Sequence, residues 1–91
     1  MATFAILADR ISDEQRAQLH EIIKAASEHG WWHHYADVWI VRGQTMTFWR
    51  DQLIGVIGPG RSAVLVVELT GNWAAYGPTS YAEWLKKHLT S

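Results

Sequence analysis

The chain has 91 residues, of which 48% are hydrophobic and 19% are charged, and its formal net charge is −1. This length gives one domain with one small core, and this composition excludes a disordered chain. The lack of cysteine excludes disulfides, thiolate metal sites and cysteine nucleophiles, and the lack of a basic stripe argues against a dedicated, high-affinity nucleic-acid binder.

The first third of the chain predicts a strand followed by a helix. Residues 3–8 (TFAILA) form an unbroken apolar run that ends at Asp9, which favours a central strand covered on both faces. Ser12 and Gln15 have the spacing of a capping box. Apolar residues then recur at helical spacing, so we expect a helix over about 12–29 that ends at Gly30.

The central stretch 31–41 (WWHHYADVWIV) holds three of the six tryptophans and two of the five histidines. We expect 31–35 to be one strand and 38–42 its antiparallel partner. A single long strand with a bulge is the alternative. Either arrangement places Trp39 and Val41 on the same side of the sheet, because side chains alternate along a strand.

The last half of the chain predicts a helix, a strand and a further helix. Thr45 or Thr47 can cap the first of these helices, and Gly58-Pro59-Gly60 ends it. Residues 63–70 (AVLVVELT) are the clearest strand, apolar on both faces. A final helix is expected from the capping box 80–83 (SYAE). The apolar stripe of the middle helix predicts that four side chains face the sheet: Phe48 or Trp49, Leu53, Ile54 and Ile57.

The predicted order of elements is βαββαβ with an appended helix, which is the α+β pattern of the ferredoxin-like sandwich with an antiparallel sheet. We assign the whole of 1–91 to this single domain. Two helices cover only one face of such a sheet, so the other apolar face needs a cover. The appended helix or the sheet of a second copy can supply it. We favour a sheet-to-sheet homodimer that buries Trp39 and Val41.

The cellular location is expected to be the cytoplasm. The chain begins Met1-Ala2-Thr3-Phe4 without a basic segment, and no apolar run approaches about 18 residues. We therefore expect a soluble protein with no membrane partner.

His33 and His34 are the candidate catalytic side chains of the central stretch. Histidine titrates near neutrality, so either can act as the general acid or base of a ribonuclease-type cleavage. As neighbours in a strand they point to opposite faces and cannot bind one ion together. The structural alternative is a histidine that bonds to the backbone or stacks on Trp31 or Trp32.

Two loops carry candidate binding residues. The segment 71–78 (GNWAAYGP) contains Trp73 and Tyr76, whose rings can stack on a ligand or a partner protein. Arg61 follows the glycines of 58–60 and can offer a guanidinium to a phosphate. That loop joins a helix to a strand, which is the reverse of a P-loop, so an ordinary turn is the alternative reading.

Five features of the chain together resemble the SinR-like family, and they cover most of the sequence. They are an apolar first strand ending in Asp9, the aromatic segment Trp31–His34 with Tyr35, the run Trp39–Val41, the turn Asn72–Ala74, and Trp84-Leu85 in the closing helix. The SinR-like family is similar in turn to the small CRISPR-adaptation subunit (the second CRISPR-associated protein) and to the VapD ribonuclease toxins.

The resemblance implies a ferredoxin-like homodimer in which Asp9 is paired across the two-fold axis, binds Mg²⁺ or Mn²⁺ and takes part in phosphodiester cleavage. The sequence departs from the relatives in having Ala8 where they carry tyrosine, and in lacking the basic DNA-binding surface of the adaptation subunit. Asp9 can equally be a turn residue after a strand. Two functions follow: a metal-dependent nucleic-acid enzyme, or a non-catalytic homodimeric module that binds a protein, a nucleic acid or a small molecule.

Overall fold

The computed structural model describes residues 1–58, 60–71, 83, 84, 86 and 87, with the backbone alone for His34 and Tyr35. The elements in chain order are β1 (Thr3–Asp9), α1 (Asp13–Ala26), β2 (Trp31–Tyr35), β3 (Val38–Arg42), α2 (Met46–Ile57) and β4 (Ala63–Leu69). The predicted hairpin of two strands is confirmed. The start of the predicted final helix lies outside the described residues.

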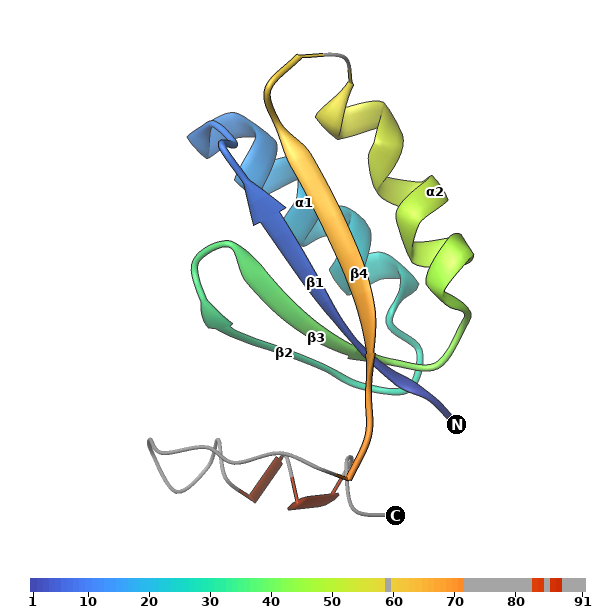
Figure 1. Ribbon diagram of the computed structural model, residues 1–91. Coiled ribbons are helices and arrows are strands. Elements are labelled where there is room, and N and C mark those ends of the chain that lie inside the picture. Colours follow the sequence, from blue (N-terminus) through green and yellow to red (C-terminus); the bar gives the residue numbers. More distant parts are fainter. Residues whose placement is uncertain (59, 72–82, 85, 88–91) are drawn as a thin grey trace.

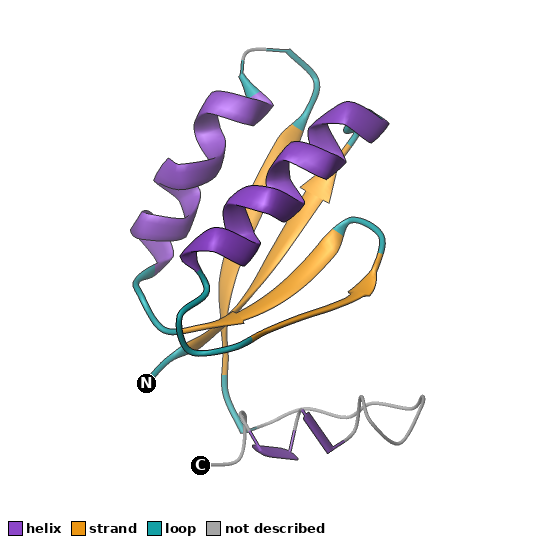
Figure 2. Ribbon diagram, turned by 180° about the vertical axis from the view of Figure 1, so that it is seen from behind, coloured by secondary structure: helices purple, strands orange, loops and turns teal. Residues whose placement is uncertain are grey.

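The four strands form one sheet in the order β2-β3-β1-β4, and every neighbouring pair is antiparallel. Both helices lie on the same face of this sheet (Figures 1 and 2). The fold is therefore α+β, and its element order and strand order are compatible with a ferredoxin-like sandwich. No helix among the described residues is long and apolar enough to cross a membrane.

Local side-chain bonds explain where the helices begin. The Ser12 hydroxyl accepts from the Gln15 amide at 3.1 Å, and the Gln15 side chain accepts from the Ser12 amide at 2.8 Å, which is the predicted capping box. Thr45 caps α2 by accepting from the Phe48 amide at 3.1 Å. The first helix ends at Ala26, three residues before the predicted end.

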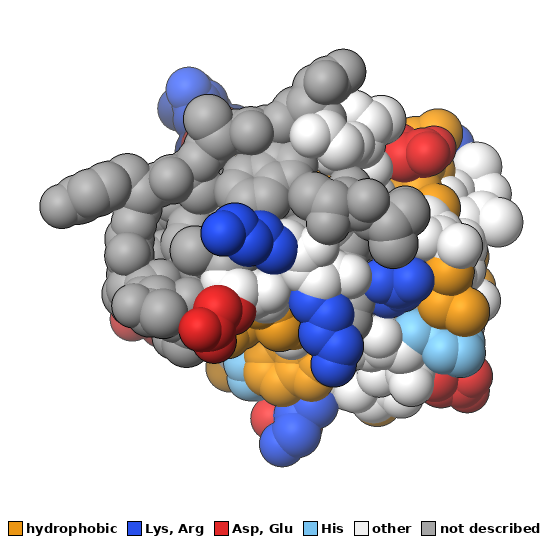
Figure 3. All heavy atoms as spheres, turned by 90° about the horizontal axis from the view of Figure 1, so that it is seen from below, with side chains coloured by type: hydrophobic (Ala, Val, Ile, Leu, Met, Phe, Trp, Pro, Cys, Tyr) orange, Lys and Arg blue, Asp and Glu red, His pale blue; other side chains and the backbone are white. Residues whose placement is uncertain are grey.

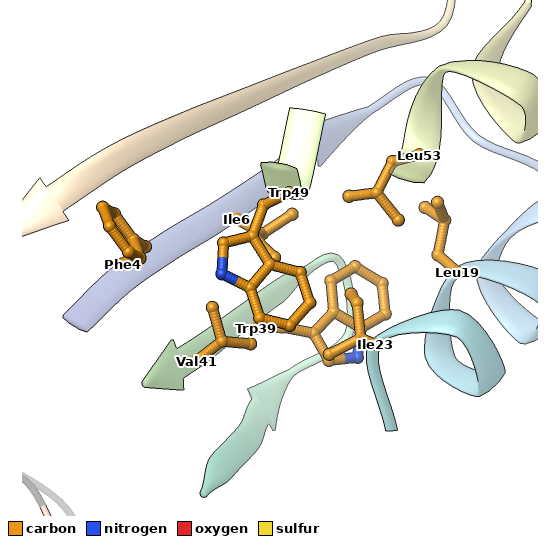
Figure 4. Close-up of a cluster of buried hydrophobic side chains, with 8 residues drawn as sticks. All are labelled: Phe4, Ile6, Leu19, Ile23, Trp39, Val41, Trp49 and Leu53. Atoms are coloured by element: carbon orange, nitrogen blue, oxygen red, sulfur yellow. The ribbon is translucent and has the colours of Figure 1, made fainter. Parts of the chain in front are cut away.

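The core lies between the sheet and the helices, and Figure 4 shows its eight buried side chains. They are Phe4, Ile6, Leu19, Ile23, Trp39, Val41, Trp49 and Leu53. Trp39 pairs in register with Ile6, and Val41 with Phe4, so all four point toward the helices. The prediction that Trp39 and Val41 face a dimer partner is therefore wrong. The prediction that Ile54 faces the sheet is also wrong, since this residue of α2 is 52% exposed.

The open face is the side of the sheet away from the helices, and it has two different halves. At one end, Trp84 packs against Ile40 together with Trp32 and Leu69. At the other end, Leu7 and Leu65 pair in register and stay 37% and 57% exposed. A residue of the appended segment thus covers part of the open face, and the Leu7–Leu65 half is accessible.

Replacement of Leu53 by alanine tests the helix-side core. Leu53 is fully buried, so Leu53→Ala should lower the free energy of unfolding by about 2–5 kcal/mol. The matched control is Ile54→Ala at the next, exposed position, with an expected change below about 0.5 kcal/mol. Urea unfolding followed by circular dichroism measures both, and equal losses would contradict this assignment of the core.

Candidate functional site

Asp9 is the last residue of β1 and pairs with Ala63 of β4. Alternation along the strand puts it on the open face, on the same side as Leu7. Its side chain is 74% exposed, and Arg10 Nε lies 3.6 Å from Oδ2. A surface ion pair of this kind contributes little, so the carboxylate remains accessible to a cation. The cap of α1 is Ser12 and not Asp9.

His33 lies on the helix side of β2, where it has a backbone partner and an aromatic one. Its Nε2 is 3.0 Å from the carbonyl oxygen of Ala36, and its ring stacks on Trp39 with centroids 4.6 Å apart. A carbonyl oxygen only accepts, so Nε2 carries the proton that is donated. The backbone contact agrees with the structural alternative for this histidine, whereas the stacking partner is Trp39 and not Trp31 or Trp32. His34 follows His33 in β2, and only its backbone is described.

His20 is a candidate site residue that the sequence analysis does not predict. It lies on α1, and its ring centroid is 5.0 Å from that of His33 and 5.1 Å from that of Trp31. Trp39 Nε1 donates to His20 Nδ1 at 3.2 Å. The spacing of 13 residues in sequence gave no signal, because the approach depends on how α1 lies across the sheet.

Arg16 holds the start of α1 to the turn between β2 and β3. Its Nε donates to Asp37 at 2.6 Å, and its Nη1 donates to Asp13 at 2.6 Å. These two hydrogen bonds, the one to Asp37 first, raise the pKa of the guanidinium above its ordinary value. The Ala8 amide also donates to the carbonyl of Asp37 at 2.9 Å. The end of β1, the start of α1 and this turn are thereby joined.

A cavity of about 390 Å³ opens between α1 and β2, beside the two histidines. We name it the α1–β2 pocket, and its lining residues are Asp13, Arg16, Ala17, His20, Glu21 and His33. The volume falls in the range typical of small-molecule sites. The pocket therefore collects two imidazoles, one guanidinium and two carboxylates at the same end of the sheet as Asp9.

The structure describes one of the three predicted binding residues. Arg61 is exposed in the loop before β4, and the neighbouring Ser62 donates to the Arg10 carbonyl at 2.8 Å, so this loop lies beside the end of β1. Trp73 and Tyr76 lie outside the described residues. Within the described part of the chain, no group of three or more histidines, aspartates or glutamates is arranged to hold one ion.

Neither the surface charge of the described residues nor the comparisons with known proteins point to a particular function. Seen from below, acidic and basic side chains are interspersed among the described residues, as the near-neutral composition predicts (Figure 3). No protein-family model, curated protein or solved structure gives a significant match to this chain. The resemblance to SinR-like proteins therefore stays a prediction.

The contact between Arg16 and Asp37 should control the order of the turn after β2. Asp37→Asn removes the charged acceptor of Arg16 Nε, so amide hydrogen exchange at Ala8 and around the turn should accelerate. Asp13→Asn removes the other, fully exposed acceptor and should leave those amides unchanged. Exchange measured by NMR compares the two, and equal effects would show that Asp37 has no special role.

Proposed function

We propose that the chain acts as a homodimer that binds a divalent cation through Asp9 and cleaves phosphodiester bonds of nucleic acid, as the SinR-like resemblance implies. The single observation that carries this proposal is the place of Asp9: an accessible carboxylate at the end of a central strand, on the same face as the exposed Leu7 and Leu65.

The apolar half of the open face supports the dimer. Leu7 and Leu65 lie side by side on neighbouring strands, and burying them against a second copy would remove apolar surface from water. In a two-fold dimer the same patch is used by both subunits. Asp9 borders that patch, so a second copy seated there would bring a second Asp9 toward the first.

Two such carboxylates would repel each other unless a proton or a cation lies between them. Carboxylate oxygens are the ligands that Mg²⁺ and Mn²⁺ prefer, and Asp9 is accessible, so this residue fits such an ion. A cation bound by Asp9 would supply an activated water and neutralise charge on the phosphate. Arg10 and Arg61, from the loops next to Asp9, offer guanidinium groups that can bind a phosphate oxygen.

Asp9→Asn tests the enzyme. The wild-type protein should cleave single-stranded RNA or DNA when Mn²⁺ or Mg²⁺ is added, and Asp9→Asn should lose at least about 100-fold in rate, since the amide does not replace a charged metal ligand. Asp51→Asn is the matched control, because Asp51 also pairs with an adjacent arginine and is 59% exposed. A loss of equal size in both variants would contradict the proposal.

A dimeric binding module without catalysis is the second candidate. The exposed Leu7–Leu65 surface supports its dimer as it supports that of the enzyme, and this candidate needs no role for Asp9. In this case a second copy of the chain packs on the Leu7–Leu65 surface, and the partner binds to another part of the molecule. The two candidates share the dimer and differ in whether Asp9 matters for any activity.

Leu65→Glu tests the dimer that both candidates need. A charge placed in the apolar patch of Leu7 and Leu65 should convert a dimer into a monomer, because burying it unpaired is costly. Ile54→Glu is the control, since Ile54 is equally exposed but lies on α2, on the other side of the molecule. Light scattering reads the mass of each, and a monomeric wild-type protein at high concentration would rule out the dimer.

A further inference from the structure

We propose that the α1–β2 pocket binds a nucleobase, a flat and uncharged heteroaromatic group that offers a hydrogen-bond acceptor next to a donor. This inference rests on the proposed function for the source of the base, a nucleic-acid strand bound at the same end of the sheet. The pocket's geometry is set by His20 and His33 and does not involve Asp9.

The neighbours of the two histidines fix which ring nitrogen carries the proton. The indole N–H of Trp39 only donates, so His20 Nδ1 accepts and the proton of the neutral ring is on Nε2. The Ala36 carbonyl only accepts, so His33 Nε2 donates to it and Nδ1 is the acceptor of the neutral ring. The neutral pair therefore keeps one further donor, His20 Nε2, and one further acceptor, His33 Nδ1, and its ring centroids lie 5.0 Å apart.

This complementary pair matches the edge of a nucleobase. Adenine, cytosine, guanine and uracil each carry a ring or carbonyl acceptor beside an N–H donor. The acceptor of the base would face His20 Nε2, and its donor would face His33 Nδ1. Because the stacking of His33 on Trp39 and the hydrogen bond of His20 hold both rings before a ligand arrives, little side-chain freedom would be lost on binding.

The charges around the pocket disfavour the two other ligand classes that histidines suggest. A phosphate would meet Asp13 and Glu21, and the Arg16 guanidinium is already bonded to Asp13 and Asp37. A zinc ion would need the lone pair of His20 Nε2, where the bond from Trp39 places the proton. An uncharged group avoids both conflicts.

The size of the pocket also suits a base with its sugar. A volume of about 390 Å³ lies near the lower end of the range for small-molecule sites. An isolated nucleoside is a small ligand, so a dissociation constant on the order of 0.1–1 mM is expected, and an oligonucleotide that also contacts the end of β1 should bind more tightly.

NMR titration with adenosine, cytidine, guanosine and uridine, in EDTA and without added metal, tests the site. At least one nucleoside should shift the side-chain signals of His20 and His33 and the indole N–H of Trp39 in a saturable way. Inorganic phosphate and Zn²⁺ are titrated separately as the competing ligand classes. The proposal would be overturned if no nucleoside gave a saturable shift, or if phosphate or Zn²⁺ shifted these signals at lower concentrations than every nucleoside.

Two variants locate the binding, each with a matched control. His33→Phe keeps a ring that can stack on Trp39 but removes the hydrogen-bond acceptor, so it should weaken nucleoside binding by about tenfold. His29→Phe, at a position outside the pocket, is its control. Ala17→Leu fills the pocket from the exposed surface of α1, so it should weaken nucleoside binding by about the same factor as His33→Phe. Ala25→Leu, at another exposed position of α1, is its control. Unchanged affinity in Ala17→Leu would overturn the proposal even if His33→Phe fails to fold.

Asp9→Asn separates this inference from the proposed function. Nucleoside binding that persists in Asp9→Asn, together with loss of cleavage, is the result expected when both are right. Nucleoside binding without any cleavage by the wild-type protein would refute the enzyme and support the pocket. Cleavage that depends on Asp9, without nucleoside shifts at His20 and His33, would refute the pocket alone.

Discussion

The buried indole of Trp39 is the group on which the rest of the structure depends. It lies in the core between the sheet and the helices, donates its N–H to His20 on α1, and carries His33 of β2 stacked on its ring. An indole N–H buried without a partner costs about 1–3 kcal/mol, so His20 must accept from it. The packing of the core thereby sets the proton position of a histidine that lines the pocket. Trp49 follows the same rule by donating to the Gly43 carbonyl at 3.0 Å.

A second constraint gathers the polar side chains at one end of the sheet. Both β1 and β2 are antiparallel to β3, so they run in the same direction and end at the same edge. Asp9 ends β1, and the turn after β2 brings Asp37 to Arg16 and to the Ala8 amide. An extended strand of nucleic acid could contact Asp9 on the open face and the α1–β2 pocket on the helix side of this edge. The two proposals thus concern opposite faces of the sheet at the same end.

The sequence predicted the elements because their signals are local. The capping box at Ser12, the hairpin after Trp31 and the apolar run of β4 each depend on residues close in the chain, and all three are present. The faces of the strands were harder to assign. Because β3 is apolar on both sides, alternation placed Trp39 and Val41 together without saying which side the helices cover.

The candidate site was predictable only in part for a related reason. His33 was singled out by its residue type and Asp9 by the resemblance to SinR-like proteins, and the structure gives both a defined place. The approach of His20 to His33 and the bond between Arg16 and Asp37 join segments that are 13 and 21 residues apart. They depend on the position of α1 over β2, which no local pattern encodes.

A crystal structure of the protein grown with Mn²⁺, in which anomalous scattering locates the metal, would test whether Asp9 binds a cation across a dimer axis. We expect a two-fold dimer packed through the open face, with Mn²⁺ bound by the Asp9 carboxylates of both copies. A dimer in which the two Asp9 residues are far apart, or Mn²⁺ bound only elsewhere, would contradict it.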